Sequence, residues 1–407
     1  MHTARPSLCI IAFAALMVGS SLIPVRVSAA GITVLENSVE HSFAQHVTFA
    51  LEAGSDAEIS QIYLFFRATQ QDETEKVKVP LQKPAREISV SHTHDARLYP
   101  LPAFAHITFW WQLEDAAGNQ LETAPRQFAY TDNRFQWKKL TADAITIHWI
   151  EGQGDPAYAQ TALDVAQASI RESNAELRAP LPDPLDIYIY DSEHHLKGAM
   201  ALSGREWAGG QARPELGVVL IAVPPEQGYA SQMKRYLPHE ITHLLIYQLT
   251  TPEGYGYVPR WLDEGLATAN ELLPTPEHAL VLEEASEAGQ LLSLKELCVP
   301  FSPNPRAAVL SYAQSASVVR FIRERYGADG IRRLLSAYAD GASCSSGVEE
   351  ALDVSFNELE SAWRDSLRPE GRWRARLDRA GVWIGLWLLS LLVAVPMIGG
   401  IRRQPGR

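Results

Sequence analysis

Cysteine is scarce in this chain, and a surplus of basic residues is absent. Three cysteines occur in 407 residues, and 36 Lys and Arg stand against 48 Asp and Glu, for a net charge of −12 at pH 7. Residues 1–30 and 382–407 contain arginine and no acid, so the part between them is more acidic than the whole. Nucleic-acid binding relies on basic patches, and the composition therefore argues against a nucleic-acid partner.

The N-terminus has the pattern of a signal peptide, which we assign to residues 1–30. Arg5 gives a positive start, Cys9–Val18 is an apolar run, and small residues allow cleavage after Ala29 or Ala30. An uncleaved anchor is the alternative, but glycine, serine and proline interrupt the apolar region after Val18 and favour cleavage. The sequence therefore predicts export of the chain.

The C-terminus contains an uncharged stretch of twenty residues, Val382–Ile401. At ~1.5 Å rise per residue, a helix of this length would span about 30 Å, the thickness of one bilayer core. We predict a transmembrane helix, a basic juxtamembrane linker at 371–381 and a cytoplasmic tail at 402–407; a buried core helix is the alternative. Arginines before Val382 favour the reverse orientation. Because the signal peptide commits the chain that follows it to export, we predict a single-pass cell-membrane protein with its catalytic domain outside the cytoplasm.

Two cysteines, Cys298 and Cys344, remain after removal of the signal peptide. An even number of cysteines in an exported chain predicts a disulfide bond between them. Two reduced cysteines, or a metal ion bound by sulfur, are the less favoured alternatives.

Residues 31–133 are predicted to form an all-β domain. Short runs with partial two-residue alternation recur along it, separated by turn-forming segments such as Ala53–Asp56. About seven such strands fit an immunoglobulin or fibronectin type III-like β-sandwich. The predicted strands are 32–35, 46–51, 59–68, 77–81, 88–91, 106–113 and 126–130. His92 and His94 mark either a polar turn or, less favoured, a second metal site.

The polar residues His239, Glu240 and His243 interrupt an apolar stretch in the predicted catalytic domain, residues 134–370. On a helix, residues four apart lie on the same face, so the two histidines can bind one metal ion. A carboxylate at Glu240 would lie at the flank, where it can take a proton from water. Zinc lowers the pKa of bound water toward about 7 and needs a third protein ligand, which Glu264 is expected to supply. A solvated helix is the alternative, but the apolar neighbours predict burial, and buried His and Glu without partners are costly.

Two motifs together resemble the gluzincin metallopeptidases, most closely the peptidase MA-like group, which is similar to the thermolysin and aminopeptidase families. They are H-E-x-x-H at 239–243 and W-L-x-E-G-L-A at 261–267. The resemblance covers about residues 135–370 and implies an α+β peptidase fold. It also implies a zinc ion with the ligands His239, His243 and Glu264 and the general base Glu240. Pro238 departs from the pattern, and because proline disrupts a helix interior, we expect the helix to begin or bend there.

The same resemblance implies two further features of substrate binding. Gly217–Val223 is expected to be the edge strand above the metal, where unpaired backbone groups bind an extended peptide. Tyr312, in Leu310–Ser315, is expected either to donate a hydrogen bond to the tetrahedral oxyanion or to pack in a helix interface. Three other residues compete for the oxyanion role: Tyr255, Tyr257 and His278.

The sequence thus predicts an α+β, membrane-anchored, extracytoplasmic zinc metallopeptidase with an N-terminal β-sandwich and a C-terminal transmembrane helix. Its substrate would be a peptide or protein, and the lack of an evident motif for binding a peptide terminus favours an endopeptidase. The alternative is a catalytically inactive binding module on the same scaffold, whose β-sandwich grips a partner. The complete set of motif residues argues against that alternative. A zinc hydrolase acting on a non-peptide amide is a third possibility.

Overall fold

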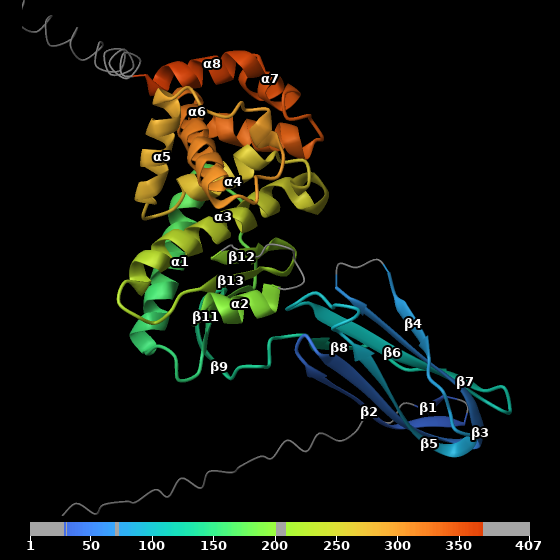
Figure 1. Ribbon diagram of the computed structural model, residues 1–407. Helices are drawn as coiled ribbons and strands as arrows, with labels where there is room; N and C mark the ends of the chain where they lie inside the picture. The colour runs from blue at the N-terminus through green and yellow to red at the C-terminus, as the bar shows by residue number, and fades with distance from the viewer. Residues whose placement is uncertain (1–27, 30, 70–72, 201–208, 369–407) are drawn as a thin grey trace, which may run out of the picture. The chain divides into compact units, whose positions relative to one another are not determined.

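Figure 1 shows the computed structural model, which describes residues 28–29, 31–69, 73–200 and 209–368. The chain divides into two compact units. The first contains the residues up to Leu101 together with His106–Tyr130, and the second contains Pro102–Ala105 and the chain from Thr131 onward. Apart from Ser28–Ala29, the predicted signal peptide lies outside the described residues.

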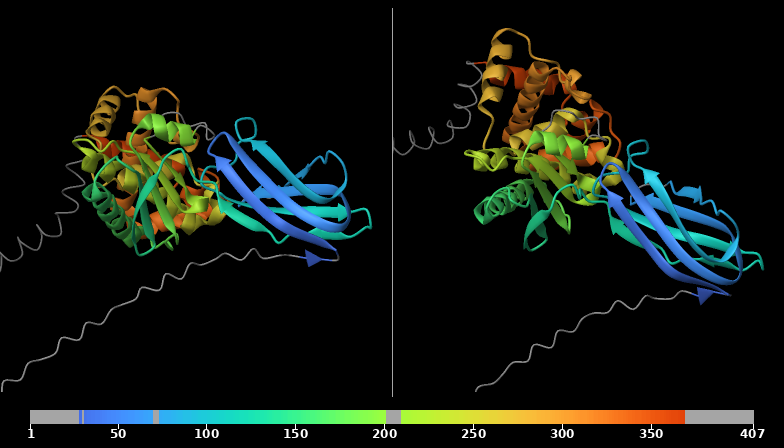
Figure 2. Two further views of the ribbon diagram at one scale, coloured as in Figure 1. Left: turned by 90° about the horizontal axis from the view of Figure 1, so that it is seen from below. Right: turned by 60° about the horizontal axis from the view of Figure 1, so that its bottom comes forward.

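The first unit is all β in the part that the structure describes, and its strands are coloured blue to cyan in Figures 1 and 2. One antiparallel sheet of eight described strands forms it. These are β1 (Ser28–Ala29), β2 (Ile32–Ser42), β3 (His46–Ala68), β4 (Glu75–Lys78), β5 (Ala85–Asp95), β6 (His106–Asp115), β7 (Gln120–Glu122) and β8 (Arg126–Ala129). Alternate residues of β3 and β6, including Leu64, Phe66, Phe109 and Trp111, form its buried core.

The long strand β3 replaces two strands of the sequence prediction, 46–51 and 59–68. Its first half pairs with β2 and β5, and its second half pairs with β4 and β6. The segment Ala53–Asp56, predicted as a turn, lies inside β3, and the register shifts between Gly54 and Ile59. A β-bulge tolerates the same small and polar residues as a turn while the strand continues, which is why the composition misled the prediction.

The second unit contains a mixed sheet of five described strands in the order β12-β13-β11-β10-β9. They are β9 (Trp137–Ala142), β10 (Ile145–Ile150), β11 (Leu185–Tyr190), β12 (Gly210–Arg213) and β13 (Val218–Ala222). β10, β11 and β13 are parallel, whereas β9 and β12 run antiparallel at the two edges. The predicted edge strand Gly217–Val223 is therefore wrong: β13 is an interior strand, and β12 forms the edge.

Helices make up the rest of the second unit. They are α1 (Pro156–Leu177), α2 (Glu193–Met200), α3 (Tyr229–Tyr255), α4 (Arg260–Ala269), α5 (Pro276–Glu287), α6 (Pro305–Ala339), α7 (Ser346–Leu352) and α8 (Phe356–Leu367), with short 3-10 turns at Pro214–Leu216 and Glu296–Cys298. Side chains cap some of their N-termini: Asp155 caps α1, and Ser355 forms a capping box with Glu358 in α8. Gly327 has a positive φ and interrupts the helical geometry of α6.

One part of the predicted fold class needs correction. Among residues 28–29, 31–69, 73–200 and 209–368, no helix combines the length and the apolar character needed to cross a membrane. The stretch Val382–Ile401, where a transmembrane helix was predicted, lies outside these residues. The fold that the structure supports is therefore a mixed α+β unit together with a β-rich unit, without the transmembrane helix.

Candidate metal centre

Helix α3 holds the H-E-x-x-H residues on its buried side. Its apolar residues pack into the core of the second unit, among them Leu237, Ile241, Leu244 and Leu245. Glu240 is 8% and His243 is 7% exposed. The predicted start of the helix at Pro238 is wrong: α3 begins at Tyr229 and continues through Pro238, and the residue with non-helical φ and ψ angles is Thr251.

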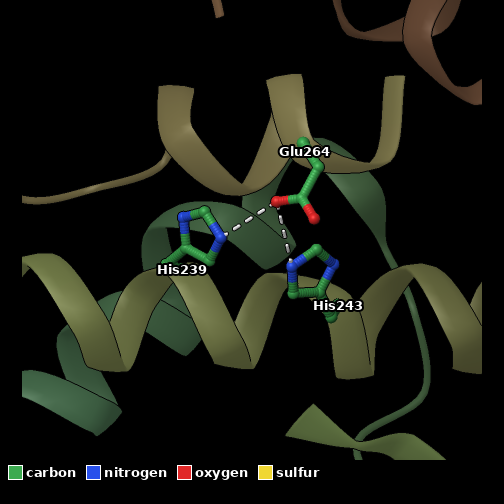
Figure 3. Close-up of side chains that lie close together, drawn as sticks. All are labelled: His239, His243 and Glu264. Carbon is green, nitrogen blue, oxygen red and sulfur yellow. Dashed lines mark hydrogen bonds and ion pairs between the residues drawn. The ribbon is translucent and has the colours of Figure 1, made fainter. Parts of the chain in front are cut away.

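Helix α4 carries Glu264 to a position above α3, as Figure 3 shows. Trp261, Leu262 and Leu266 of this helix are fully buried. Gly265 allows α4 to approach α6 closely, because a Cβ atom at this position would lie only 2.7 Å from the backbone oxygen of Ser315. The close packing leaves the Glu264 side chain 3% exposed and directed at the two histidines.

The structure brings together the three predicted ligands, His239, His243 and Glu264. One donor atom from each lies within 4.8 Å of the others, and in the described part of the chain this is the only group of three or more such residues. Oε2 of Glu264 is 3.2 Å from Nε2 of His239 and 3.6 Å from Nε2 of His243. Both imidazoles thus present the same nitrogen to one point in space (Figure 3).

A ring of acidic side chains fixes the orientation of both imidazoles. Nδ1 of His243 donates a hydrogen bond of 2.7 Å to Asp263, and Nδ1 of His239 lies 3.6 Å from Oε1 of Glu271. Carboxylates that hold the outer nitrogen of a metal-binding histidine select the tautomer whose inner nitrogen can bind the metal. Asp263 is itself held by hydrogen bonds from Tyr255 and Arg260.

The same carboxylates favour a positive charge on the histidines. Burial lowers the pKa of His239, but hydrogen bonds to Glu264 and Glu271 outweigh this effect and raise it to about 9. Burial also lowers the pKa of His243, but the charges of Asp263 and Glu264 raise it well above its usual range. The arrangement therefore favours a cation at this position.

The two glutamates of the motifs differ in their affinity for protons. Burial raises the pKa of Glu264, but His243, His239 and Arg260 together hold it well below the usual range. Burial raises the pKa of Glu240 above its usual range, and the two histidines offset only part of this effect. Glu264 is therefore suited to remain an anionic ligand, and Glu240 is suited to accept a proton.

The edge strand β12 positions Glu240. A Cβ atom at Gly210 would lie 2.7 Å from Oε1 of Glu240, so only glycine leaves room for this carboxyl group. The Glu240 carboxylate also accepts a backbone hydrogen bond from Ala212. The predicted general base thus lies against β12, the edge strand of the sheet among the described residues, and beside the histidines.

The four candidates for the oxyanion role occupy different places. The ring centroid of Tyr312 on α6 is 6.3 Å from that of His239, and the ring also contacts Phe301. The hydroxyl group of Tyr255 donates to the carboxylate of Asp263. The side chain of Tyr257 is 59% exposed. His278 lines a cavity beside the centre. Tyr312 is thus the candidate whose ring lies near that of a predicted ligand, while its catalytic role stays a prediction.

Sequence reasoning missed the residues that support the ligands. Asp263 could have been found, because it directly precedes Glu264 in the second motif and an acid there can reach a histidine of the facing helix. Arg260, three residues before Asp263, donates to its carboxylate and forms a 2.6 Å ion pair with Glu264. Gly210 and Glu271 reach the centre only through tertiary packing, and their local sequence carries no signal for it.

Cys298 and Cys344 form a disulfide bond in the structure, the pair that the sequence predicts. It joins the 3-10 turn after α5 to the loop before α7. Both sulfur atoms are used in this bond, which leaves the metal centre with nitrogen and oxygen donors.

The residues of the centre fit a zinc ion. Two imidazole nitrogens and one carboxylate oxygen form the donor set of a catalytic zinc site, which keeps a fourth position open. The carboxylates behind both histidines, and the raised histidine pKa values, show that this buried centre is complementary to a cation.

Comparison with known proteins supports the same assignment. A sequence model of the Peptidase MA superfamily matches residues 165–369, just over half of the chain. This match confirms the resemblance that the two motifs indicate. No match was found among curated proteins.

Solved structures give fainter likenesses. An aminopeptidase N family protein from Idiomarina loihiensis aligns with 77% of this chain and 71% of its own, at 8% identity and a TM-score of 0.37. Yeast LTA4 hydrolase in complex with bestatin aligns with 84% of this chain and 63% of its own, at 10% identity and a TM-score of 0.31. A β-1,3-glucan binding domain of carbohydrate-binding module family 56 aligns with 24% of this chain and 99% of its own, at 13% identity and a TM-score of 0.17. Scores this low establish no shared fold, so the assignment rests on the sequence match.

Proposed function

Because this chain belongs to the Peptidase MA superfamily, we propose that it is a zinc-dependent peptidase whose zinc ligands are His239, His243 and Glu264. The observation that carries the proposal is the convergence of these three donor atoms within 4.8 Å, with Glu240 at their flank. A zinc ion bound there would supply a Lewis acid and lower the pKa of water.

The chain's own residues supply the remaining parts of a hydrolytic site. Glu240 has a raised pKa and would take the proton from the attacking water and pass it to the leaving amine. Tyr312, next to His239, would donate a hydrogen bond to the oxyanion that develops during attack. Arg260 forms an ion pair with Oε1 of Glu264, so that Oε2 remains directed at the histidines.

The open edge of β12 would bind the peptide in an extended conformation. The backbone oxygen of Gly209 accepts a hydrogen bond from Ala222 on β13. Because backbone groups alternate in direction along a strand, those of Gly210 and Ala212 point away from β13. The N–H of Ala212 binds Glu240, so the backbone groups of Gly210 and the carbonyl of Ala212 would pair with the peptide. A peptide added there as a further strand would have its backbone fixed next to the general base.

Metal analysis together with peptide-library cleavage tests this proposal. Wild-type protein should contain one zinc ion per chain and cleave peptides, whereas His239→Ala, His243→Ala and Glu264→Ala should each lose the metal. Glu240→Gln should keep zinc and lose about 10²–10⁴-fold in activity. Loss of zinc from Glu240→Gln would refute the division of roles, and a zinc-loaded wild type that cleaves no peptide would refute the peptidase assignment.

We further propose that the peptidase works in an oxidising compartment outside the cytoplasm. The disulfide between Cys298 and Cys344 supports this location, because such bonds persist mainly in exported proteins. Thiol labelling of protein denatured without reductant should detect neither cysteine. Full labelling of both in protein isolated from its native source would contradict the proposal.

A further inference from the structure

A cavity of about 360 Å³ lies between α4, α5 and α6. Its size is in the range of small-ligand pockets, roughly 300–1,000 Å³, and the proposed function leaves it without a role. Its lining includes Glu271, Ala279, Leu282, Glu283, Arg320 and Leu367.

The cavity borders the metal centre. Glu271 lines it and also lies 3.6 Å from Nδ1 of His239. Ala313 lines it as well and directly follows Tyr312, whose ring faces His239. A peptide bound over the centre would therefore have a side chain within reach of the cavity.

The cavity combines apolar walls with an acidic floor. Ala313, Leu282 and Leu367 supply apolar wall surface. The Glu271 side chain is 8% exposed, and among the described residues it forms no ion pair with a lysine or arginine. Its Oε2 accepts one hydrogen bond, from Thr275. A carboxylate can accept about four, so Glu271 retains capacity for a cationic donor.

The charges at the rim oppose one another. Glu283 and Arg320 both line the cavity, and both are exposed. His278 adds little positive charge, because burial lowers its pKa. Together with Glu271 the cavity thus has two carboxylates and one guanidinium, and the more deeply placed charge is negative.

Resting on the proposed peptidase function, we propose that this cavity is the specificity pocket for a lysine or arginine side chain next to the cleaved bond. The methylene stem would lie against Leu282 and Leu367, and the cationic tip would approach Glu271. A purely apolar side chain would take Glu271 out of water and add no donor to those of His239 and Thr275, and an acidic one would be repelled.

Library cleavage by the zinc-loaded wild type tests the pocket and the function separately. Lysine or arginine should be enriched at one fixed position beside the cleaved bond, and cleavage by Glu240→Gln should be about 10²–10⁴-fold slower. Cleavage without a basic preference would overturn the pocket and leave the peptidase function standing. If the zinc-loaded wild type cleaves nothing, both proposals fail.

Pocket variants then locate the preference. The readout is the ratio of kcat/KM for a peptide with lysine to that for the same peptide with norleucine, which has a similar stem and no charge. Ala279→Trp, from an exposed helix position that lines the cavity, should lower the ratio by roughly tenfold. Leu280→Trp is the matched control, since Leu280 is 61% exposed and does not line the cavity. An equal effect of the two tryptophans would overturn the assignment.

The two rim charges give opposite expectations. Glu283→Gln should lower the lysine-to-norleucine ratio and Arg320→Gln should raise it, each by about two- to fivefold, as expected for exposed charges. Both variants should keep the zinc content of the wild type, since neither residue contacts a ligand. Ratios that move in the same direction, or not at all, would show that the cavity does not read the charge of the substrate.

Discussion

Gly210→Ala should displace the general base while leaving the fold and the metal ligands intact. The new Cβ atom would lie 2.7 Å from Oε1, 2.9 Å from Cγ and 3.0 Å from Cδ of Glu240. The backbone at Gly210 does not have the positive φ that would itself exclude alanine. The strain would therefore fall on the Glu240 side chain, whose carboxyl end must move away from β12.

The size of the effect follows from these contacts. Restoring an ordinary van der Waals separation requires the carboxyl group to move by roughly 1 Å, and misplacement by this distance costs about 10²-fold in rate. That loss corresponds to roughly 2.7 kcal/mol of transition-state stabilisation. The free energy of unfolding should fall by no more than about 1–3 kcal/mol, the usual cost of overpacking, because the displaced atoms are at the end of a side chain.

The assay compares kcat/KM, zinc content and melting temperature in three proteins. Gly210→Ala is compared with wild type and with Gly54→Ala, a strand glycine at which a Cβ would meet its nearest atom at an ordinary 3.8 Å. The control variant should match wild type in all three measurements. Gly210→Ala should keep zinc and lose activity through kcat, since proton transfer rather than peptide binding is impaired.

Two results would refute this reasoning. Wild-type kcat/KM in a folded, zinc-loaded Gly210→Ala variant would show that Glu240 does not act from its position beside β12. Loss of zinc with the fold intact would show that Gly210 supports the ligands, and that the division between ligands and base is drawn in the wrong place.

Three further variants test the surroundings of the centre. Asp263→Asn should weaken zinc binding by about 10–100-fold, because the amide no longer provides the carboxylate that orients His243; competition with a chelator measures it, and unchanged affinity would contradict the role. Replacing both Cys298 and Cys344 by serine should lower the free energy of unfolding by about 4 kcal/mol for a sequence separation of 46; urea unfolding measures it, and an unchanged midpoint would count against it. Tyr312→Phe should keep zinc but lower kcat by roughly 10²-fold if the hydroxyl serves the oxyanion; unaltered kinetics would leave Tyr312 a packing residue.

The ligand set could be predicted because its geometry is local. Residues four apart on a helix share a face whatever surrounds them, so His239 and His243 need only the helix to form. Glu264 required a second element, and the motif around it indicated which glutamate to choose. Glu271 and Gly210 depend on how α4 and β12 approach α3, and neither lies in a pattern that predicts such an approach.

The edge strand of the second unit was assigned wrongly, although the composition of the sequence indicates the correct strand. All five residues Val218–Ala222 are buried, and a continuous apolar run is typical of an interior strand covered on both faces. The family resemblance suggested an edge position for this run, against its composition. The true edge, Gly210–Arg213, is short and contains glycine and arginine, as edge strands often do.

The two glutamates show how one residue type serves two tasks in one buried site. Both Glu240 and Glu264 are removed from water, which alone would raise the pKa of each. Glu264 lies between the histidines and Arg260, and these neighbours more than repay the cost of its negative charge. Glu240 lies against Gly210 with one backbone hydrogen bond from Ala212, so its charge is less well compensated and a proton is more readily accepted. Pairs of carboxyl groups whose surroundings separate their proton affinities are typical of acid–base sites. The environment, more than the motif, thus assigns ligation to one glutamate and proton transfer to the other.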